Sequence, residues 1–160
     1  MASPLAVPSW LDGLLNLESN PAPLIAAAGR RTTPNGQSSW EIVGSTYWDP
    51  TAYQLDREDL SLTVKWKAIL QTSAIGNAAN IALWDVSGIT NKGVPQLVPL
   101  STLSYSASLT ETFVETELPA LEVGSALTGP GVLRTVLWLQ TPTPGLIATT
   151  FNAWLEPSFQ

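Results

Sequence analysis

The side chains that most often act as nucleophiles, general bases and zinc ligands are missing from this sequence, which contains no histidine and no cysteine. Their absence excludes histidine-based triads, thiolate chemistry and the common zinc sites. Paired carboxylates, which can hydrolyse glycosidic bonds, remain conceivable. The densest group of acids is Glu111, Glu115 and Glu117, and a second run of charges is Asp56-Arg57-Glu58-Asp59.

Neither group has the spacing of a reactive site. Glu111, Glu115 and Glu117 fall in one register of an alternating stretch, which is typical of a solvated or salt-paired strand face. The run at 56–59 lacks the regularly alternating acids, central glycine and terminal glutamate of a calcium loop. No glycine-rich phosphate loop stands between a strand and a helix. We therefore expect a protein that is not an enzyme and that uses no metal or cofactor.

Aromatic side chains leave a binding function open. Trp48, with Tyr47 and Tyr53 near the break at Asp49-Pro50, could form a platform that stacks on sugar rings. The alternative is that these rings pack in the core or at a subunit contact, where large aromatic side chains are common. A flat row of exposed rings beside a groove would favour carbohydrate binding, and its absence would favour assembly.

The stretch from Leu60 to Val86 predicts the architecture. An apolar residue recurs at every second position, as in a half-buried β-strand, through Leu60, Leu62, Val64, Trp66, Ala68 and Leu70. A second strand is expected around 81–86, after Asn77-Ala78-Ala79-Asn80. We expect these two strands to be neighbours in one antiparallel sheet.

Charges on two strands predict a pairing. Thr110 to Leu118 alternates acids with apolar or small residues, so one face of this strand is acidic. Lys65 and Lys67 occupy the outward register of the long strand at 60–70. Opposite charges directly across a strand pair stabilise a sheet by roughly 0.2 to 1 kcal/mol each. We expect the lysines to pair with these glutamates.

Two strands near the C-terminus complete the predicted sheets. Val132 to Gln140 is apolar in nearly both registers and should be central with both faces covered. Leu146 to Glu156 should place Ile147, Thr149, Phe151, Ala153 and Leu155 inward and pair with the preceding strand as a hairpin. Together the patterns predict an all-β fold, an antiparallel sandwich of jelly-roll-like type with about eight strands.

Residues 1–36 differ from residues 37–160, which we expect to form the sandwich domain. Five prolines within 1–36 disfavour long regular elements, so this segment should be an extended N-terminal arm with at most one short helix. An apolar stripe of Trp10, Leu11, Leu14 and Leu15 would be its anchor. The arm either clamps a neighbouring molecule or straps its own core, and we take the stripe as the candidate interface.

Composition limits the possible partners. Charged residues make up 12% of the chain, about half of the roughly 25% usual for soluble proteins. Such a surface is typical of stable subunit interfaces, which are depleted in Lys, Glu and Asp. A net charge of −6 with seven basic residues makes nucleic-acid binding unlikely. The sequence contains no run of 18 apolar residues that would predict a membrane span. It also shows no secretory signal, so we expect an intracellular origin.

The stretch from Leu60 to Val86 ends in Ile81-Ala82-Leu83-Trp84-Asp85-Val86 and a Ser-Gly turn. With the strands at 132–155, it resembles the β-sandwich domains of bacteriophage virion proteins, which include capsid decoration, head-fibre and tail-associated proteins. The resemblance implies a virion component made in the host cytoplasm, most simply a capsid decoration or stabilising subunit. Its implied partners are further copies of itself, often as a trimer, and virion proteins such as the major capsid protein. A carbohydrate-binding module or receptor-binding tail protein is the alternative.

Overall fold

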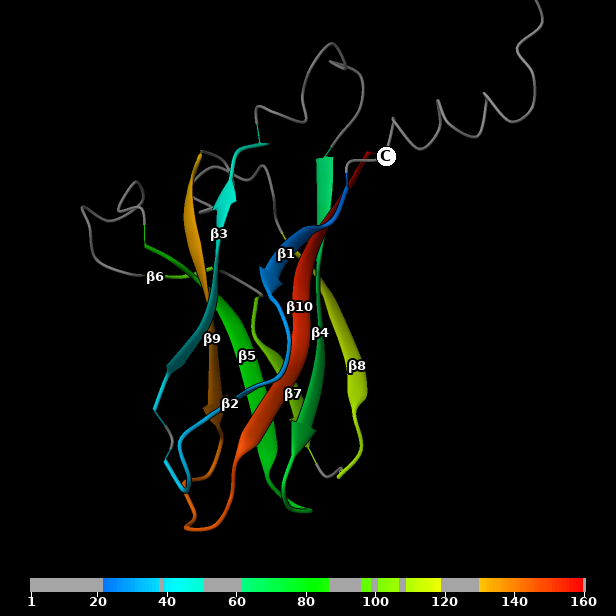
Figure 1. The fold of residues 1–160 in the computed structure, drawn as a ribbon. Coiled ribbons are helices and arrows are strands. Elements are labelled where there is room, and N and C mark those ends of the chain that lie inside the picture. Colours follow the sequence, from blue (N-terminus) through cyan, green and yellow to red (C-terminus); the bar gives the residue numbers. More distant parts are fainter. Residues whose placement is uncertain are drawn as a thin grey trace, which may run out of the picture.

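The computed structural model describes residues 22–37, 39–50, 62–86, 96–98, 101–106, 109–118 and 130–159. Within these residues, ten strands form two five-stranded sheets in which every pairing is antiparallel (Figure 1). No helix in this part of the chain is long and apolar enough to cross a membrane.

The first sheet contains β1 (Leu24–Ala27), β2 (Arg31–Thr32), β4 (Leu62–Thr72), β8 (Thr112–Leu118) and β10 (Ala148–Phe159). Its order is β1-β10-β4-β8, with β2 beside β10. The second sheet contains β3 (Glu41–Trp48), β5 (Ala78–Asp85), β6 (Gln96–Leu97), β7 (Leu103–Ser106) and β9 (Gly131–Leu139). Its order is β3-β9-β5-β6, with β7 beside β5.

This arrangement confirms the predicted jelly-roll-like sandwich. β1 and β2 follow one another along β10, and β6 and β7 follow one another along β5, so each pair acts as one interrupted strand. Two sheets of four strands then remain in the described residues, as in a jelly roll. Consecutive strands lie in opposite sheets from β3 to β5 and again from β8 to β10.

Two of the three predicted strand pairings were wrong. β4 and β5 lie in opposite sheets, and so do β9 and β10, whose predicted hairpin does not form. A period-two pattern identifies the face of a strand that is buried, but it says nothing about which strand lies beside it. In both places the chain turns a corner between the sheets, around Gly76 and Gly145, which have positive φ angles of 84° and 88°.

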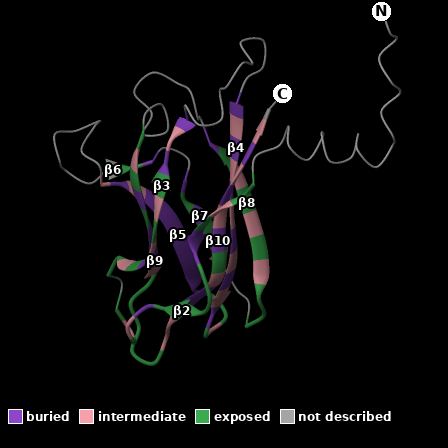
Figure 2. Ribbon diagram, turned by 45° about the horizontal axis from the view of Figure 1, so that its top comes forward, coloured by how far each residue is buried: buried purple, intermediate pink, exposed green. Residues whose placement is uncertain are grey.

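The core lies between the two sheets, and buried residues, purple in Figure 2, run almost without interruption along β5. The inward register predicted for the long strand is confirmed, since its predicted inward residues within β4 are at most 4% exposed, namely Leu62, Val64, Trp66, Ala68 and Leu70. Trp66 on β4 and Trp48 on β3 are fully buried. β9 is central in its sheet, as predicted, because it pairs with β3 on one side and β5 on the other.

The predicted inward register of the last strand holds for one half of β10 only. Ala153 and Leu155 lie in the core, as expected. A register shift between Thr150 and Asn152 places an extra residue in β10 opposite β4. A β-bulge of this kind reverses the faces on one side of it. Ala148, expected to face outward, is therefore a core residue.

The sandwich begins earlier in the sequence than the predicted boundary between residues 36 and 37. Leu24 pairs with Leu155, and Arg31 pairs with Thr150, so β1 and β2 extend the first sheet beyond β10. Pro34 ends this segment without preventing it from forming short edge strands, where proline is tolerated. Residues 1–21, the remainder of the predicted arm, lie outside the described residues.

A close approach of β1 and β3 closes one edge of the sandwich. A Cβ atom at Gly44 would overlap the backbone carbonyl of Ala26 on β1. The hydroxyl of Thr135 on β9 donates a buried hydrogen bond of 3.0 Å to the same carbonyl oxygen. Glycine at position 44 lets the two sheets approach here, and Thr135 satisfies the carbonyl that becomes buried.

The corner between β4 and β5 depends on Asn77, which is 6% exposed. Its Nδ2 donates to the carbonyl oxygen of Thr141 at 2.9 Å. Its Oδ1 accepts hydrogen bonds from the backbone N–H groups of Ala78 at 2.8 Å and Thr141 at 3.1 Å. One side chain thus joins the start of β5 to the segment that follows β9.

Replacing Asn77 by alanine should lower the free energy of unfolding by about 2 kcal/mol or more, because buried backbone groups lose their partners. Urea denaturation would measure this loss. The control is Asn35→Ala, which removes one exposed hydrogen bond to Gly145 and should cost under about 1 kcal/mol. Equal stability of the two variants would contradict this role of Asn77.

Candidate docking surface

The outer face of the first sheet carries lysines and glutamates side by side. Lys65 lies opposite Glu117, and Lys67 lies opposite Glu115. On the other side of β4, Glu156 of β10 is the partner of Lys65 in register. The predicted pairing of the lysines with the glutamates of β8 is confirmed, and the acids Glu115 and Glu117 are accounted for as strand partners.

Lys67 is the centre of this charged face. Its Nζ lies 2.7 Å from Oε2 of Glu156 and 3.7 Å from Oε2 of Glu115, and its side chain is 15% exposed. The Lys67 ammonium also lies 6.0 Å from the ring centroid of Phe113, whose ring is 6.0 Å from that of Trp154. The hydrogen bond from Lys67 holds the pKa of Glu156 below its ordinary value.

The ion pair should make stability depend on pH in a defined direction. Because the pKa of Glu156 is lowered on folding, its contribution is fully present above the ordinary glutamate pKa and is lost as the pH falls through the lowered value. Lys67→Met should therefore cost up to about 1 kcal/mol at pH 7, and less as the pH falls below roughly 4. Denaturation at a series of pH values would measure this.

Lys65→Met is the matched control, because Lys65 makes the smallest of the contributions that lower the pKa of Glu156. We expect it to cost less than Lys67→Met at pH 7. A cost of Lys67→Met that stayed constant from pH 7 to pH 3 would contradict the ion-pair explanation.

The outer face of the second sheet is apolar instead. Among the described residues, nine large apolar side chains are exposed, and five of them belong to this face. We call this surface the tryptophan face and define it by side chains of β3, β9, β5 and β6 and of the residue before β3. These are Trp40, Ile42, Tyr47, Trp84, Leu97, Val132, Arg134 and Trp138.

Three indole rings cover the middle of the tryptophan face. The ring centroid of Trp40 lies 3.7 Å from that of Trp138 and 4.9 Å from that of Trp84. The interplanar angles are 49° and 51°, so the rings pack against each other at a tilt. Val136 and Ala82, which pair with each other on this side of the sheet, are fully buried. The indoles therefore cover Val136 and Ala82 on the outer side of their own sheet. Trp40 nevertheless remains 40% exposed.

Two polar side chains, Arg134 and Asn80, lie in the outward register of the second sheet. Arg134 lies between Ser45 and Trp84, is exposed, and forms no ion pair with another described residue. Asn80, which pairs with Trp138, is 4% exposed. Its Oδ1 accepts a 2.7 Å hydrogen bond from the hydroxyl of Ser104, while its buried Nδ2 has no partner in the described residues. The face thus offers one exposed cation among apolar groups, whereas the Nδ2 of Asn80 is buried beneath it.

The residues expected to stack on a sugar do not form one platform. Trp48 is fully buried in the core, whereas Tyr47 is 62% exposed on the tryptophan face. Adjacent residues of a strand point to opposite faces, so these two rings cannot lie side by side. Tyr53 lies outside the described residues. The predicted interface residues Trp10, Leu11, Leu14 and Leu15 also lie outside them.

Sequence patterns did not identify the tryptophan face. Its signal was present, since Trp84 and Trp138 stand in the outward register of β5 and β9, where a solvated face would carry polar residues. The apolar residues in both registers of 132–140 predict burial on both faces of this strand. In the structure Val136 is buried, but Val132 is 38% exposed, so that face is covered in part only.

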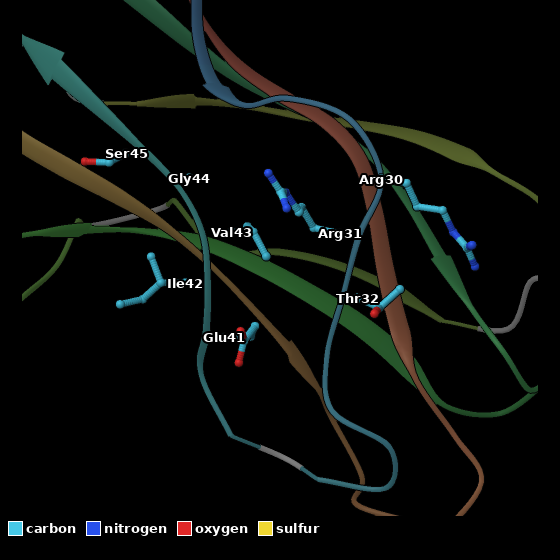
Figure 3. A pocket seen from close by; sticks show the side chains of 8 residues that line it. All are labelled: Arg30, Arg31, Thr32, Glu41, Ile42, Val43, Gly44 and Ser45. Atoms are coloured by element: carbon cyan, nitrogen blue, oxygen red, sulfur yellow. The ribbon is translucent and has the colours of Figure 1, made fainter.

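A groove lies beside the tryptophan face, between β2 and β3 (Figure 3). Its volume is about 620 Å³, and it is lined by residues 30–32 and 41–45. Arg31 extends toward β3, whereas Arg30 points away from it. In the described part of the chain, no cluster of acids, histidines or cysteines could hold a metal ion. The groove brings one cation, Arg31, toward β3 and adds no reactive constellation within the described residues.

Comparison with known proteins gives matches in structure alone. No protein-family model matches the chain, and no curated protein sequence matches it. Similar solved structures include infectious bursal disease virus strain Gx, with 13% identity, a TM-score of 0.49, and coverage of 85% of this chain and 30% of that chain. The VP2 subviral particle of the same virus has 12% identity, a TM-score of 0.48, and coverage of 85% and 32%.

A human norovirus GI.7 Houston strain VLP is also similar, with 14% identity and a TM-score of 0.43. That match covers 96% of this chain and 32% of the other. The chain thus spans about a third of the length of the proteins whose structures it resembles.

Proposed function

We propose that this chain is a structural subunit of a virus particle, a bacteriophage capsid decoration or stabilising protein that assembles through the tryptophan face. The observation that carries the proposal is the gathering of Trp40, Ile42, Tyr47, Leu97 and Val132 on one sheet surface, each at least 38% exposed. Soluble monomers usually scatter such side chains, and contiguous apolar patches mark interaction sites.

The contrast between the two sheets supports the proposal. The first sheet presents Lys65, Lys67 and the glutamates of β8 in register, beside two exposed apolar side chains, Ile25 and Phe113. The second presents aromatic and apolar groups with a single exposed arginine, and aromatic residues and arginine are the types enriched in interfaces. The resemblance of 60–86 and 132–155 to phage virion proteins points to the same role. The partners are further copies, as a trimer in that class of protein, and a major capsid protein.

No described feature favours carbohydrate binding over assembly. The indoles of the tryptophan face pack on each other at tilts of 49° and 51° and so do not make a flat row. Sugar rings stack on aromatic faces, and here Trp40 already uses its ring against Trp84 and Trp138. Binding to immobilised glycans is therefore the control experiment, with no binding expected.

The role in a particle can be tested with the virus that encodes this chain. Particles purified through a density gradient should contain the chain at a fixed ratio to the major capsid protein, measured by quantitative mass spectrometry. A variant with Ile42→Asp on the tryptophan face should be lost from particles, whereas Ile25→Asp on the first sheet should be retained. Particles that lack the unaltered chain would overturn the proposal.

A further inference from the structure

The tryptophan face needs an occupant with two properties. It must offer apolar side chains to five exposed apolar groups of the face, and it must supply negative charge to the exposed Arg134. A second tryptophan face is a poor partner, because docking two such faces about a twofold axis brings their Arg134 side chains into one interface. Like charges in an interface are unfavourable.

Residues 1–21 have both properties in their sequence. They contain Asp12 and Glu18 and no lysine or arginine. The same segment contains Trp10, Leu11, Leu14 and Leu15, so its acids stand among its largest apolar residues. Its charge is thus opposite to that of Arg134 and of Arg31, which extends toward β3 in the neighbouring groove. Charge complementarity of this kind selects a partner and its register.

Length allows this segment to reach another molecule. Twenty-one residues precede the described part of the chain, and a fully extended segment of that length spans up to about 70 Å. The chain enters the first sheet at Leu24, beside Leu155 of β10. It therefore enters on the sheet opposite to the tryptophan face of its own molecule, and the segment is long enough to reach a neighbouring copy.

We propose that the tryptophan face of one copy binds residues 1–21 of a second copy, with the apolar stripe on the indoles and Asp12 or Glu18 near Arg134. This inference rests on the proposed function and specifies its contact. Exchange of the segment makes each copy both donor and recipient. The oligomer is closed when the rotation that relates neighbouring copies, applied repeatedly, returns to the first copy.

Disulfide trapping tests the contact, because the native chain contains no cysteine. Full-length chains with Leu14→Cys and with Ile42→Cys, carrying tags of different mass, are mixed and oxidised. The yield of disulfide-linked heterodimer should be several-fold higher than the yield from a mixture of Leu14→Cys with Glu117→Cys, whose cysteine lies on the first sheet. Equal yields, or a higher yield with Glu117→Cys, would overturn the inference.

Charge reversal provides the second arm of the test. Arg134→Glu in the recipient should lower the heterodimer yield several-fold, and Asp12→Lys with Glu18→Lys in the donor should restore it. A chain carrying both Leu14→Cys and Ile42→Cys should form covalent oligomers. If it forms an internal disulfide alone, the segment covers its own face and the inference fails. If the chains assemble but these cross-links do not form, the inference is overturned and the proposed function stands. If the chains do not assemble at all, both are overturned.

Discussion

Replacing Gly44 by alanine should lower the free energy of unfolding by about 3 kcal/mol or more, one of the largest effects expected for a single added methyl group. A Cβ at this position overlaps the carbonyl of Ala26, which is backbone and cannot rotate away. Relief requires β1 and β3 to separate, which weakens the buried hydrogen bond from Thr135 to that carbonyl. Thermal or urea unfolding of the variant measures the loss.

The control for Gly44→Ala is Ser45→Ala, the neighbouring substitution at an exposed position of the same strand. It should change stability by no more than about 0.5 kcal/mol. If Gly44→Ala were as stable as Ser45→Ala, the close approach of the two sheets at this edge would be contradicted.

Ile42→Asp should weaken assembly at least about 30-fold, since burying an unpaired charge at an interface costs about 2 kcal/mol or more. Ile42 is 52% exposed on the tryptophan face, so the same change should leave the fold intact. Sedimentation velocity over a concentration series measures the association, and the melting temperature checks the fold.

Ile25→Asp is the matched control for this prediction. Ile25 is 57% exposed on β1 and pairs with Trp154 in the first sheet. We expect it to assemble like the unaltered chain. Loss of assembly in Ile25→Asp but not in Ile42→Asp would move the interface to the first sheet and contradict the proposed surface.

The parts of the fold that depend on a buried face were predictable. Alternation from Leu62 to Leu70 identified the inward side of β4, because a strand packed on one side must carry its apolar residues in one register. The charges of Lys65 and Lys67 likewise predicted the pairing with β8. Such features depend on residues that are close together in the sequence, and they hold in any fold that buries one face of the strand.

Features that depend on distant parts of the chain were not predictable in the same way. The corner at Asn77 sends β5 into the opposite sheet through bonds to Thr141, 64 residues away. The bulge of β10 between Thr150 and Asn152 reverses its register without a proline or glycine to mark it. The tryptophan face combines Trp40, Trp84 and Trp138 from three separate stretches, so it exists only once the second sheet is assembled.

Side-chain footprinting with hydroxyl radicals tests most directly whether the tryptophan face is an interface. The unaltered full-length chain is labelled at low and high concentration, and oxidation is read residue by residue by mass spectrometry. Tyr47 and Trp40 are 62% and 40% exposed on the tryptophan face, and Phe113, on the outer face of the first sheet, is 52% exposed and serves as the internal reference. We predict that labelling of Tyr47 and Trp40 falls as concentration rises while that of Phe113 stays constant. Unchanged labelling at all three, or protection of Phe113 alone, would contradict assembly through this face.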